Sequence, residues 1–360
     1  MGEAAVSFDV APAATIGGAA TLIAGATGFI GKFVAEASIA RGVPTYVLRR
    51  PGASAAAPSK EAVIRSLQQK GAVVIEGYAN DKDFIEKKLK ELNIEVVISV
   101  LGGRNLLDQL PLIEAIKAAG TVKRFLPSEF GNDVDRANPV EPGLRVYEEK
   151  RKVRRAVEAA GVPFTYICCN SIAGWPYYEQ YDHCEAVPPL EKFSIYGDGN
   201  MKAYFVACCD IGKFAIMAAH DDRTINKTVH FRPPCNFLSM NELATLWENK
   251  IGRSLPRIAV SEAALLAAAA ENRIPESFVA SFTHDVFFKG CQQNFSIDGR
   301  QDLEVTELYP GVTFRTMEEC FEDFAAGILG EEIGRTELPA YEKICHSKRE
   351  KEREREIIRA

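Results

Sequence analysis

The chain has 360 residues, of which 47% are hydrophobic, and a net charge of -6 with an isoelectric point near 5.6. This length and apolar content allow a large core, which we expect to be divided between two lobes. The acidic balance, without a basic stripe interleaved with aromatic residues, argues against a nucleic-acid partner. No apolar run approaches the ~20 residues needed to cross a bilayer, so no membrane partner is expected.

The cysteines and the first residues bear on the cell compartment. The nine cysteines lack paired CxxC spacing and the chain shows no secretory leader, which indicates free thiols in a reducing compartment. The pairs Cys168-Cys169 and Cys208-Cys209 lie in apolar runs, where small core residues are expected. Residues 1–18 are rich in Ala and Gly without Lys or Arg, which predicts a disordered tail rather than a transit peptide. A cytoplasmic enzyme is therefore expected.

Residues 21–36 carry the strongest motif of the chain. An apolar run enters a turn with glycines at 25, 28 and 31, and the following residues have helical character. The order strand, Gly-rich turn and helix is typical of the corner that binds the pyrophosphate of a dinucleotide. A glycine at 25 allows the tight turn, one at 28 lets backbone N–H groups approach phosphate, and one at 31 lets the helix pack closely. The candidate cofactor-binding residues of this turn are Gly25, Thr27, Gly28, Phe29, Ile30 and Gly31.

The end of the second expected strand indicates which nicotinamide cofactor is bound. The run 44–48 ends at Arg49 and Arg50, about 20 residues after the glycine turn. An acidic residue at this point accepts from the 2′-OH of NAD, whereas an arginine suits the 2′-phosphate of NADP. We therefore predict NADP(H), held by Arg50 with help from Lys60 on the next helix. The alternative is a solvated basic strand end.

Strands and helices alternate along the first half of the chain. Further strands are expected at 72–77, 96–100 and 164–169, and helices at 60–70, 107–119 and 147–160. The small residues after the strand at 96–100 include Gly102, against which a nicotinamide ribose can lie. This alternation predicts an α/β fold with a doubly wound Rossmann-type parallel sheet and a smaller α/β substrate-binding domain. The expected divisions are a tail at 1–18, an NADP-binding domain at 19–170, a substrate-binding domain at 171–330 with segments returning to the main sheet, and a charged tail at 331–360.

The second half carries weaker local signals. The aromatic stretch 175–181, with Tyr177, suits either an aromatic ligand or a hydrophobic plug. Asp198-Gly199 predicts a hairpin between strands at 195 and 203, and Asp210 is expected to cap a helix ending near 219. The pairs Ser239/Glu242 and Thr316/Glu319 predict capping boxes. Residues 348–356 are all charged, with mixed signs, and predict a solvated helix.

Proton transfer is expected to depend on one lysine. Short-chain reductases often place Tyr and Lys four apart on a helix, but here Tyr147 and Lys150 are three apart and Val146 stands four before the lysine. Lys150 is thus the leading proton-transfer group, and nearby positive charges would lower its pKa. The alternative is one more exposed charge on a basic helix. Arg154, one turn further on, can face the cofactor.

Two further expectations concern the second lobe and metals. His284 lies on an expected helix, where a lone histidine is either structural or in contact with substrate. No His, Cys and Asp constellation has metal-ligand spacing, so no metal is predicted.

Taken together, these motifs resemble a group of plant reductases that contains the isoflavone, pinoresinol-lariciresinol, phenylcoumaran benzylic ether and leucoanthocyanidin reductases, within the NmrA-like, atypical short-chain reductases. The resemblance spans about residues 20–330. Arg124-Phe125-Leu126-Pro127, Ile167-Cys168-Cys169-Asn170 and Thr283-His284-Asp285 resemble three signatures of the leucoanthocyanidin reductases.

The resemblance implies roles for individual residues. It implies that Lys150 is the catalytic base and that Arg154, Arg50 and the glycine turn contact NADP. Leucoanthocyanidin reductases typically have an acid–base histidine after Phe-Gly, where this chain has Asn132, and the run 130–136 looks more like the benzylic ether reductases. Asn132 can hydrogen-bond a leaving oxygen but cannot donate a net proton, so water or a substrate hydroxyl would supply it. The substrate-binding candidates are Tyr147, Asn170, Ser171, Tyr177 and His284.

The implied reaction is reduction of a flavan-3,4-diol such as leucocyanidin to a flavan-3-ol such as catechin. Lys150 would deprotonate a phenol, the C4 oxygen would leave to give a quinone methide, and hydride from NADPH would be added at C4. The alternatives are a benzylic ether or isoflavone reductase and, in another class, a non-catalytic NADP-sensing regulator. The preferred hydroxylation and stereochemistry, the use of cysteine-conjugated flavanols and the oligomeric state stay open.

Overall fold

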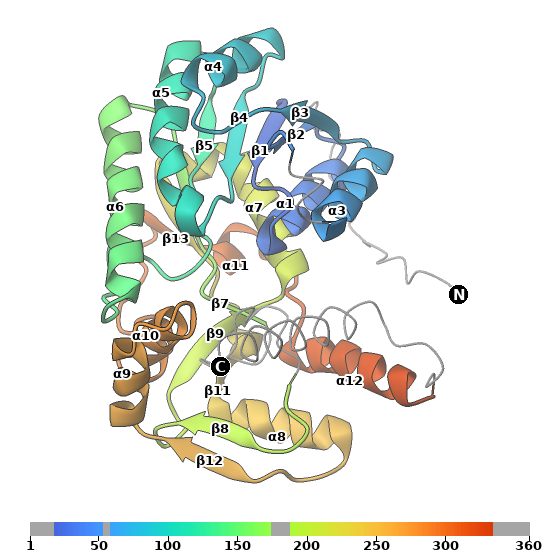
Figure 1. Cartoon of the computed structure of the whole chain (residues 1–360), viewed down its shortest axis with the longest axis vertical. Helices are drawn as coiled ribbons and strands as arrows, with labels where there is room; N and C mark the ends of the chain where they lie inside the picture. The colour runs from blue at the N-terminus through green and yellow to red at the C-terminus, as the bar shows by residue number, and fades with distance from the viewer. Residues whose placement is uncertain (1–17, 53–57, 174–187, 334–360) are drawn as a thin grey trace, which may run out of the picture.

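The computed structural model describes residues 18–52, 58–173 and 188–333. In Figure 1 a parallel sheet flanked by helices forms the upper part, and smaller sheets with four further helices form the lower part. Most of the two expected tails (1–17 and 334–360) and the aromatic stretch 175–181 with Tyr177 lie outside the described residues, whereas 331–333 belong to the helix Met317–Ile333. In the described part of the chain, we find no helix with the length and apolar character of a membrane span.

The main sheet contains five parallel strands in the order β3-β2-β1-β4-β5. Their bounds are β1 Thr21–Ala24, β2 Thr45–Arg49, β3 Val73–Glu76, β4 Val96–Ser99 and β5 Arg124–Leu126. Strands β1 and β4 are buried along their whole length, as expected when helices cover both faces of a parallel sheet. The strand order reverses direction at β1, which places a crevice over the carboxyl ends of β1 and β4.

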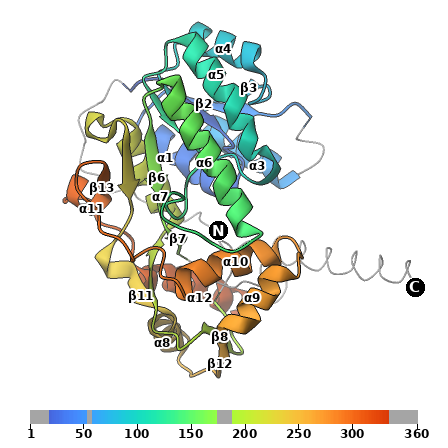
Figure 2. The same cartoon turned by 90° about the vertical axis from the view of Figure 1, so that its left-hand side faces the viewer.

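Helices cover both faces of this sheet because alternate residues of each strand point to opposite faces. Ile23 packs into a core formed by α1 (Phe29–Ala40), α3 (Pro58–Gln69) and α7 (Cys208–Ala219). Leu22 packs into a second core on the other face. Figure 2 shows the helices of that face side by side. The helices of that second face are α4 (Lys82–Glu91), α5 (Gln109–Ala119, preceded by the 3₁₀ turn Gly103–Asp108) and α6 (Gly143–Ala160).

Segments from the second half of the chain return to the sheet. Strand β6 (Thr165–Cys168) lies beside β5, to which it is joined by a bridge between Phe125 and Phe164. Strand β10 (Lys227–His230) pairs with β6, and β13 (Asp302–Glu304) pairs with β10, both in parallel. Helix α11 (Val305–Leu308) follows β13. Helix α7 packs against α1 so closely that a Cβ added at Gly212 would lie 2.3 Å from the carbonyl oxygen of Phe33. The boundary near residue 170 stays a prediction.

The lower part contains two small sheets around a separate core. One sheet has the order β11-β9-β7, and the other pairs β12 with β8. The core holds Trp247 and Phe321, both fully buried, with rings 5.5 Å apart. The strands are β7 Ser171–Ile172, β8 Phe193–Tyr196, β9 Lys202–Val206, β11 Phe237–Ser239 and β12 Arg257–Val260, and the helices are α8 Met240–Ile251, α9 Glu262–Ala270, α10 Glu276–Phe287 and α12 Met317–Ile333.

Two of the local predictions for this half are wrong. A turn forms at Asp198-Gly199, but β8 pairs with β12 and β9 pairs with β7 and β11, so the two strands form no hairpin. Asp210 is not the N-cap of α7, which is Ala207. It lies inside the first turn, where it accepts from the backbone N–H of Arg315 at 2.6 Å.

Both predicted capping boxes are confirmed. At the start of α8, the N–H of Glu242 donates to Ser239 Oγ while the N–H of Ser239 donates to the Glu242 carboxylate. Thr316 and Glu319 make the same reciprocal pair before α12. These motifs were predictable because all their hydrogen bonds are local in sequence.

Candidate active site

The glycine turn after β1 has the shape that a phosphate-binding corner requires. Gly25 has φ +93°, and a Cβ there would lie 2.6 Å from the carbonyl oxygen of Val100. A Cβ at Gly31 would lie 2.1 Å from the carbonyl oxygen of Gly25, so a side chain at either position would clash with backbone. Helix α1 begins at Phe29 with Gly28 as N-cap, which offers no capping side chain. The first N–H groups of α1 are therefore available to an anion.

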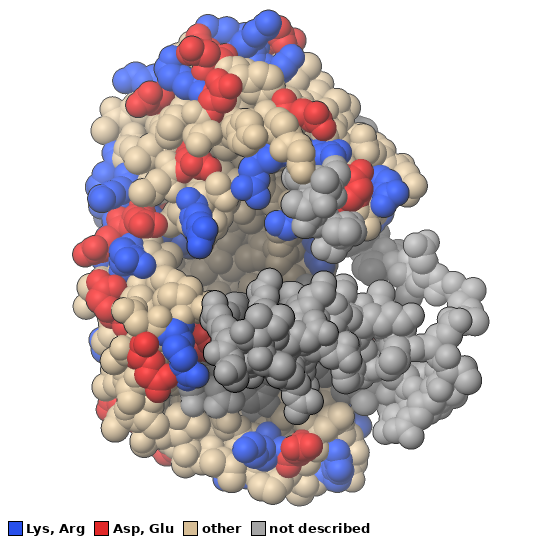
Figure 3. Space-filling model, in the orientation of Figure 1, with Lys and Arg blue, Asp and Glu red and all other residues tan. Residues whose placement is uncertain are grey.

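A cavity of about 480 Å³ lies over the carboxyl ends of β1, β2 and β4. Figure 3 shows a hollow on this face of the molecule with Lys and Arg side chains at its rim. Six of the predicted cofactor residues line the cavity, namely Gly25, Thr27, Gly28, Arg50, Lys60 and Gly102. Phe29, Ile30 and Gly31 are not among its lining residues, and Phe29 instead stacks edge-on against Phe33 in α1.

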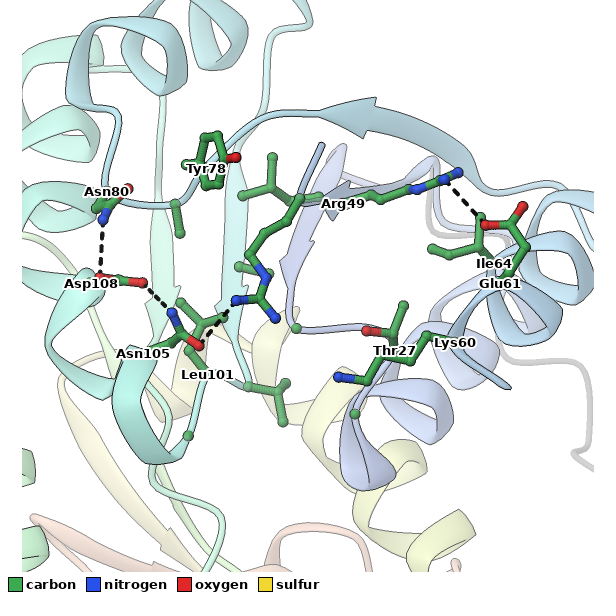
Figure 4. Close-up of a pocket in the computed structure, with 18 residues that line it drawn as sticks. Thr27, Arg49, Lys60, Glu61, Ile64, Tyr78, Asn80, Leu101, Asn105 and Asp108 are labelled. Carbon is green, nitrogen blue, oxygen red and sulfur yellow. Dashed lines mark hydrogen bonds and ion pairs between the residues drawn. The ribbon is translucent and has the colours of Figure 1, made fainter. Parts of the chain in front are cut away.

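The two arginines that end β2 have different surroundings. Arg49 is turned toward Glu61 on α3, with 3.2 Å between its guanidinium nitrogen and the carboxylate, as Figure 4 shows. Arg50 is exposed at the cavity and donates to Asn105 Oδ1 at 3.5 Å. Lys60 lies across the cavity, beside Thr27 (Figure 4). Two positively charged side chains thus face the same space, an arrangement that suits a phosphate.

Sequence reasoning missed the polar wall opposite α3. Asn105 donates to Asp108 at 2.8 Å and Asn80 donates to the other oxygen of the same carboxylate at 3.2 Å, and both contacts are drawn in Figure 4. Tyr78 also lines the cavity. All four residues follow the carboxyl ends of β3 and β4, and their place after parallel strands is the signal that could have found them.

A second cavity, of about 300 Å³, lies further along the same edge of the sheet, where the chain leaves β5 and β6. The N-terminal half of α6 and one face of α10 close it, and these helices meet in both Figure 1 and Figure 2. Its lining is mainly apolar, and four predicted site residues come together with Lys150 here. The lining residues are Phe130, Gly131, Asn132, Val146, Tyr147, Lys150, Asn170, Ser171, Ile172, Val279, Phe282, Thr283, Val286 and Phe287.

Lys150 lies in this second cavity rather than on an exposed basic face. Its ammonium donates to the backbone carbonyl of Glu129, and burial lowers its pKa, opposed by the negative charge of Glu129. Neighbouring positive charges were expected to lower this pKa, but burial is the largest cause and only Arg154 contributes in the expected way. Arg151 turns away to the carbonyls of Val134 and Ala137, and repulsion by Arg154 is a minor contribution.

Arg154 lines neither cavity, so the prediction that it contacts the cofactor directly is wrong. Its side chain is 2% exposed and lies between Glu129 and Asp133, with nitrogen–oxygen distances of 2.8 Å and 2.7 Å. A third carboxylate, Asp135, lies 3.0 Å away. The guanidinium therefore ties α6 to the loop that contains Asn132, and it supports the second cavity from behind.

Asn132 belongs to a chain of buried side-chain amides. Its Nδ2 donates to the hydroxyl of Tyr147 at 3.1 Å, and its Oδ1 accepts from Gln292 Nε2 at 2.9 Å. Gln292 also donates to Ser171 Oγ at 2.7 Å, and its Oε1 accepts from the backbone N–H of Tyr204 at 2.8 Å. Gln292 is 2% exposed and was not predicted, because nothing local marks it as part of a site 160 residues away.

His284 is not placed to contact a ligand. It is 2% exposed, its Nε2 lies 2.8 Å from Glu262 on α9, and its ring stacks on Phe288. The structural alternative for this residue therefore holds. The same helix instead presents Phe282 and Thr283 to the cavity.

Three potential metal ligands gather in the structure although their spacing in sequence gave no sign of it. Asp133, Cys168 and His230 are buried with their donor atoms within 4.8 Å of one another. Each is already engaged: Asp133 pairs with Arg154, His230 lies 3.2 Å from Asp302, and burial raises the pKa of the Cys168 thiol. A cation here would have to displace the Arg154 guanidinium, so the group is better described as part of the ion-pair network.

The sequence matches the NmrA-like family over residues 19–321. This chain belongs to the NmrA-like family. Among its relatives, leucoanthocyanidin reductase of Desmodium uncinatum is 60% identical over 304 residues, which cover 84% of this chain and 79% of the relative. A phenylcoumaran benzylic ether reductase of Pyrus communis is 46% identical over 84% of this chain and 97% of the relative. A solved binary complex of leucoanthocyanidin reductase and NADPH from Vitis vinifera is 59% identical, with a TM-score of 0.82 over 85% of this chain and 99% of that one. The doubly wound fold predicted from the sequence is thereby confirmed for this NmrA-like chain.

Proposed function

We propose that this protein is an NADPH-dependent reductase that converts flavan-3,4-diols such as leucocyanidin into flavan-3-ols such as catechin. The observation that carries the proposal is a half-buried lysine with a lowered pKa in a mainly apolar cavity, beside the cavity that the glycine turn lines. Leucoanthocyanidin reductases at about 60% identity support the choice of substrate.

The residues of the first cavity fit NADP(H). The glycine cradle leaves no room for a Cβ at Gly25 or Gly31, and Gly28, the N-cap of α1, lines the same space. Arg50 and Lys60 suit a 2′-phosphate, and Gly102 leaves open space beside the end of β4. When bound, NADPH supplies the hydride.

Lys150 is suited to start the reaction as a base. Because burial lowers its pKa, a larger share of the amine is neutral near neutral pH than for an exposed lysine. The amine takes the proton of a ring phenol, which pushes out the C4 oxygen and leaves an electrophilic quinone methide carbon. After C4 is reduced, the ammonium returns its proton to the phenolate. The aromatic and aliphatic walls, such as Phe282 and Val286, exclude water from that carbon.

One observation favours a second candidate, reduction of a phenylcoumaran benzylic ether. Asn132 stands where leucoanthocyanidin reductases typically carry a histidine, and the run 130–136 resembles the benzylic ether reductases. The same base and the same hydride donor would serve ether cleavage. An NADP-sensing regulator would need neither Lys150 nor the apolar cavity.

The test is turnover, followed by the loss of NADPH absorbance. Purified protein with NADPH and leucocyanidin should yield a flavan-3-ol, and a phenylcoumaran dimer in place of leucocyanidin tests the second candidate. Lys150→Ala should keep NADPH binding and lose at least ~100-fold in kcat, the usual range for a general base. Lys152→Ala, an exposed lysine on the same helix, is the matched control and should keep its turnover. The proposal would be contradicted if the wild-type protein oxidised no NADPH when given leucocyanidin and none when given the phenylcoumaran dimer.

Asn132→His provides a further check on substrate choice. An imidazole at this position restores an acid–base group, so turnover of leucocyanidin should be kept or raised. A large loss would mean that the Asn132 amide has a role of its own. We also propose a cytoplasmic location, supported by the reduced thiols of six described cysteines, namely Cys168, Cys169, Cys209, Cys235, Cys291 and Cys320.

A further inference from the structure

The loss of the C4 oxygen as water needs a proton that the Asn132 amide cannot give. Tyr147, which is 6% exposed, lines the same cavity as Lys150. We propose that the Tyr147 hydroxyl is the catalytic acid that protonates the departing C4 oxygen, an inference that rests on the proposed function. Gln292 and Asn132 are positioning residues that orient this hydroxyl.

The direction of each hydrogen bond follows from one backbone group. The N–H of Tyr204 can only donate, so the atom of Gln292 that faces it is the carbonyl oxygen, Oε1. The amide nitrogen of Gln292 therefore faces Asn132 and must meet its oxygen, Oδ1. This leaves the nitrogen of Asn132 to donate to the oxygen of Tyr147. The hydrogen bonds thus determine which end of each amide is oxygen and which is nitrogen, although the two atoms have nearly the same shape.

This chain of hydrogen bonds does not engage the hydroxyl proton of Tyr147. Its oxygen accepts from Asn132, and among the described residues none accepts a hydrogen bond from it. The ring is held by stacking on Phe282, with 5.1 Å between centroids and 20° between planes. A hydroxyl with a fixed ring and one occupied lone pair has a defined direction for its O–H bond. Both Tyr147 and Asn132 line the cavity, so a ligand bound there is within reach as an acceptor for this proton.

The protons balance over one cycle. Lys150 takes the phenol proton, the C4–O bond breaks with its electron pair on oxygen, and Tyr147 gives its proton to that oxygen, releasing water. After C4 is reduced, the Lys150 ammonium reprotonates the product phenolate, and the Tyr147 phenolate takes one proton from solvent. That is the one proton that the overall reduction consumes. Burial raises the pKa of the Tyr147 hydroxyl. The C4 oxygen would otherwise leave as hydroxide, which is a much stronger base than a phenolate, so it draws the proton from Tyr147 as the C4–O bond breaks.

A binding experiment tests the contact without turnover. With NADP⁺ in place of NADPH, Tyr147→Phe should bind a flavan-3,4-diol about three- to tenfold more weakly than wild type, as for one lost neutral hydrogen bond. The same variant should bind a flavan-3-ol, which has no C4 oxygen, within twofold of wild type. Equal changes for both ligands, or no change for either, would overturn the assignment.

A leaving-group experiment tests the proton transfer. Tyr147→Phe should lose at least ~100-fold in kcat with the diol. It should lose less than ~5-fold with a flavan-3-ol bearing a thioether at C4, because a thiolate with a pKa near 8.5 leaves without an acid. Gln292→Met should show the same preference with a smaller loss on the diol. Tyr309→Phe, which removes a hydroxyl bonded to Asp221 at 3.0 Å outside both cavities, is the control and should behave as wild type.

The outcomes separate this inference from the proposed function. Suppose that the wild-type protein reduces the diol and that Tyr147→Phe loses kcat equally on the diol and on the C4 thioether. Tyr147 would then have only a structural role, and only the inference would be overturned. A wild-type protein that reduces no flavan-3,4-diol would overturn both.

Discussion

Replacing Arg154 by methionine tests how far the buried ion pairs hold the site together. In the folded protein the guanidinium compensates Glu129 and Asp133, whose side chains are 1% and 4% exposed. Methionine would keep much of the volume but leave both carboxylates buried without this partner. Breaking a buried pair in this way costs about 3–5 kcal/mol. Arg136, 3.2 Å from Asp133, retains one contact, so we expect a value near the lower end of this range.

The neighbouring arginine provides a matched control. Arg155 contacts Asp135 at 2.8 Å, much as Arg154 does at 3.0 Å, but its side chain is 56% exposed. Solvent screens this pair, so Arg155→Met should cost at most about 1 kcal/mol. Urea unfolding followed by fluorescence measures both free energies of unfolding, and the thermal midpoint should fall by about 4–7 °C for Arg154→Met. Equal losses for the two variants would refute the claim that burial makes the Arg154 network strong.

Three further expectations concern the two cavities. Gly31→Ala should abolish NADPH binding in a fluorescence titration, because its Cβ would lie 2.1 Å from the oxygen of Gly25, whereas Gly311→Ala, with open space around it, should bind as wild type. Arg50→Ala should weaken NADPH binding by about 10-fold, the effect of one lost charged hydrogen bond, and leave NADH binding unchanged; equal losses for both cofactors would mean that Arg50 does not contact the 2′-phosphate. Because Lys150 must be neutral to act, kcat should rise with pH through a pKa that burial holds below that of an ordinary lysine, and a pH-independent kcat from pH 5 to 9 would contradict its role as base.

The nucleotide corner could be predicted from sequence because its determinants are local. The glycines at 25, 28 and 31 are three residues apart, and the strand and helix around them show their own periodicity. The capping boxes at Ser239 and Thr316 were predictable for the same reason. In each case the partners lie within a few residues of one another.

The surroundings of charged side chains could not be predicted in this way. Nothing in the sequence near Arg154 indicates that its side chain will be buried against two carboxylates that lie 21 and 25 residues earlier in the chain. Gln292 joins the site through contacts 88 to 160 residues away. The strands around Asp198-Gly199 have a turn between them, yet more distant strands compete successfully for their edges. Pairing and burial are decided by tertiary packing, which periodicity does not encode.

The close packing of α7 on α1 has a consequence for how the protein is made. Helix α1, which opens the nucleotide corner, has one side covered by residues 208–219, and Gly212 is needed for their approach. During synthesis, the first 170 residues emerge with that side of α1 still bare. The nucleotide corner is therefore completed only after β7, β8 and β9, which precede α7 in the chain, have left the ribosome. Ribosome-bound chains that stop before residue 208 should not retain NADPH, although every glycine of the turn is already present.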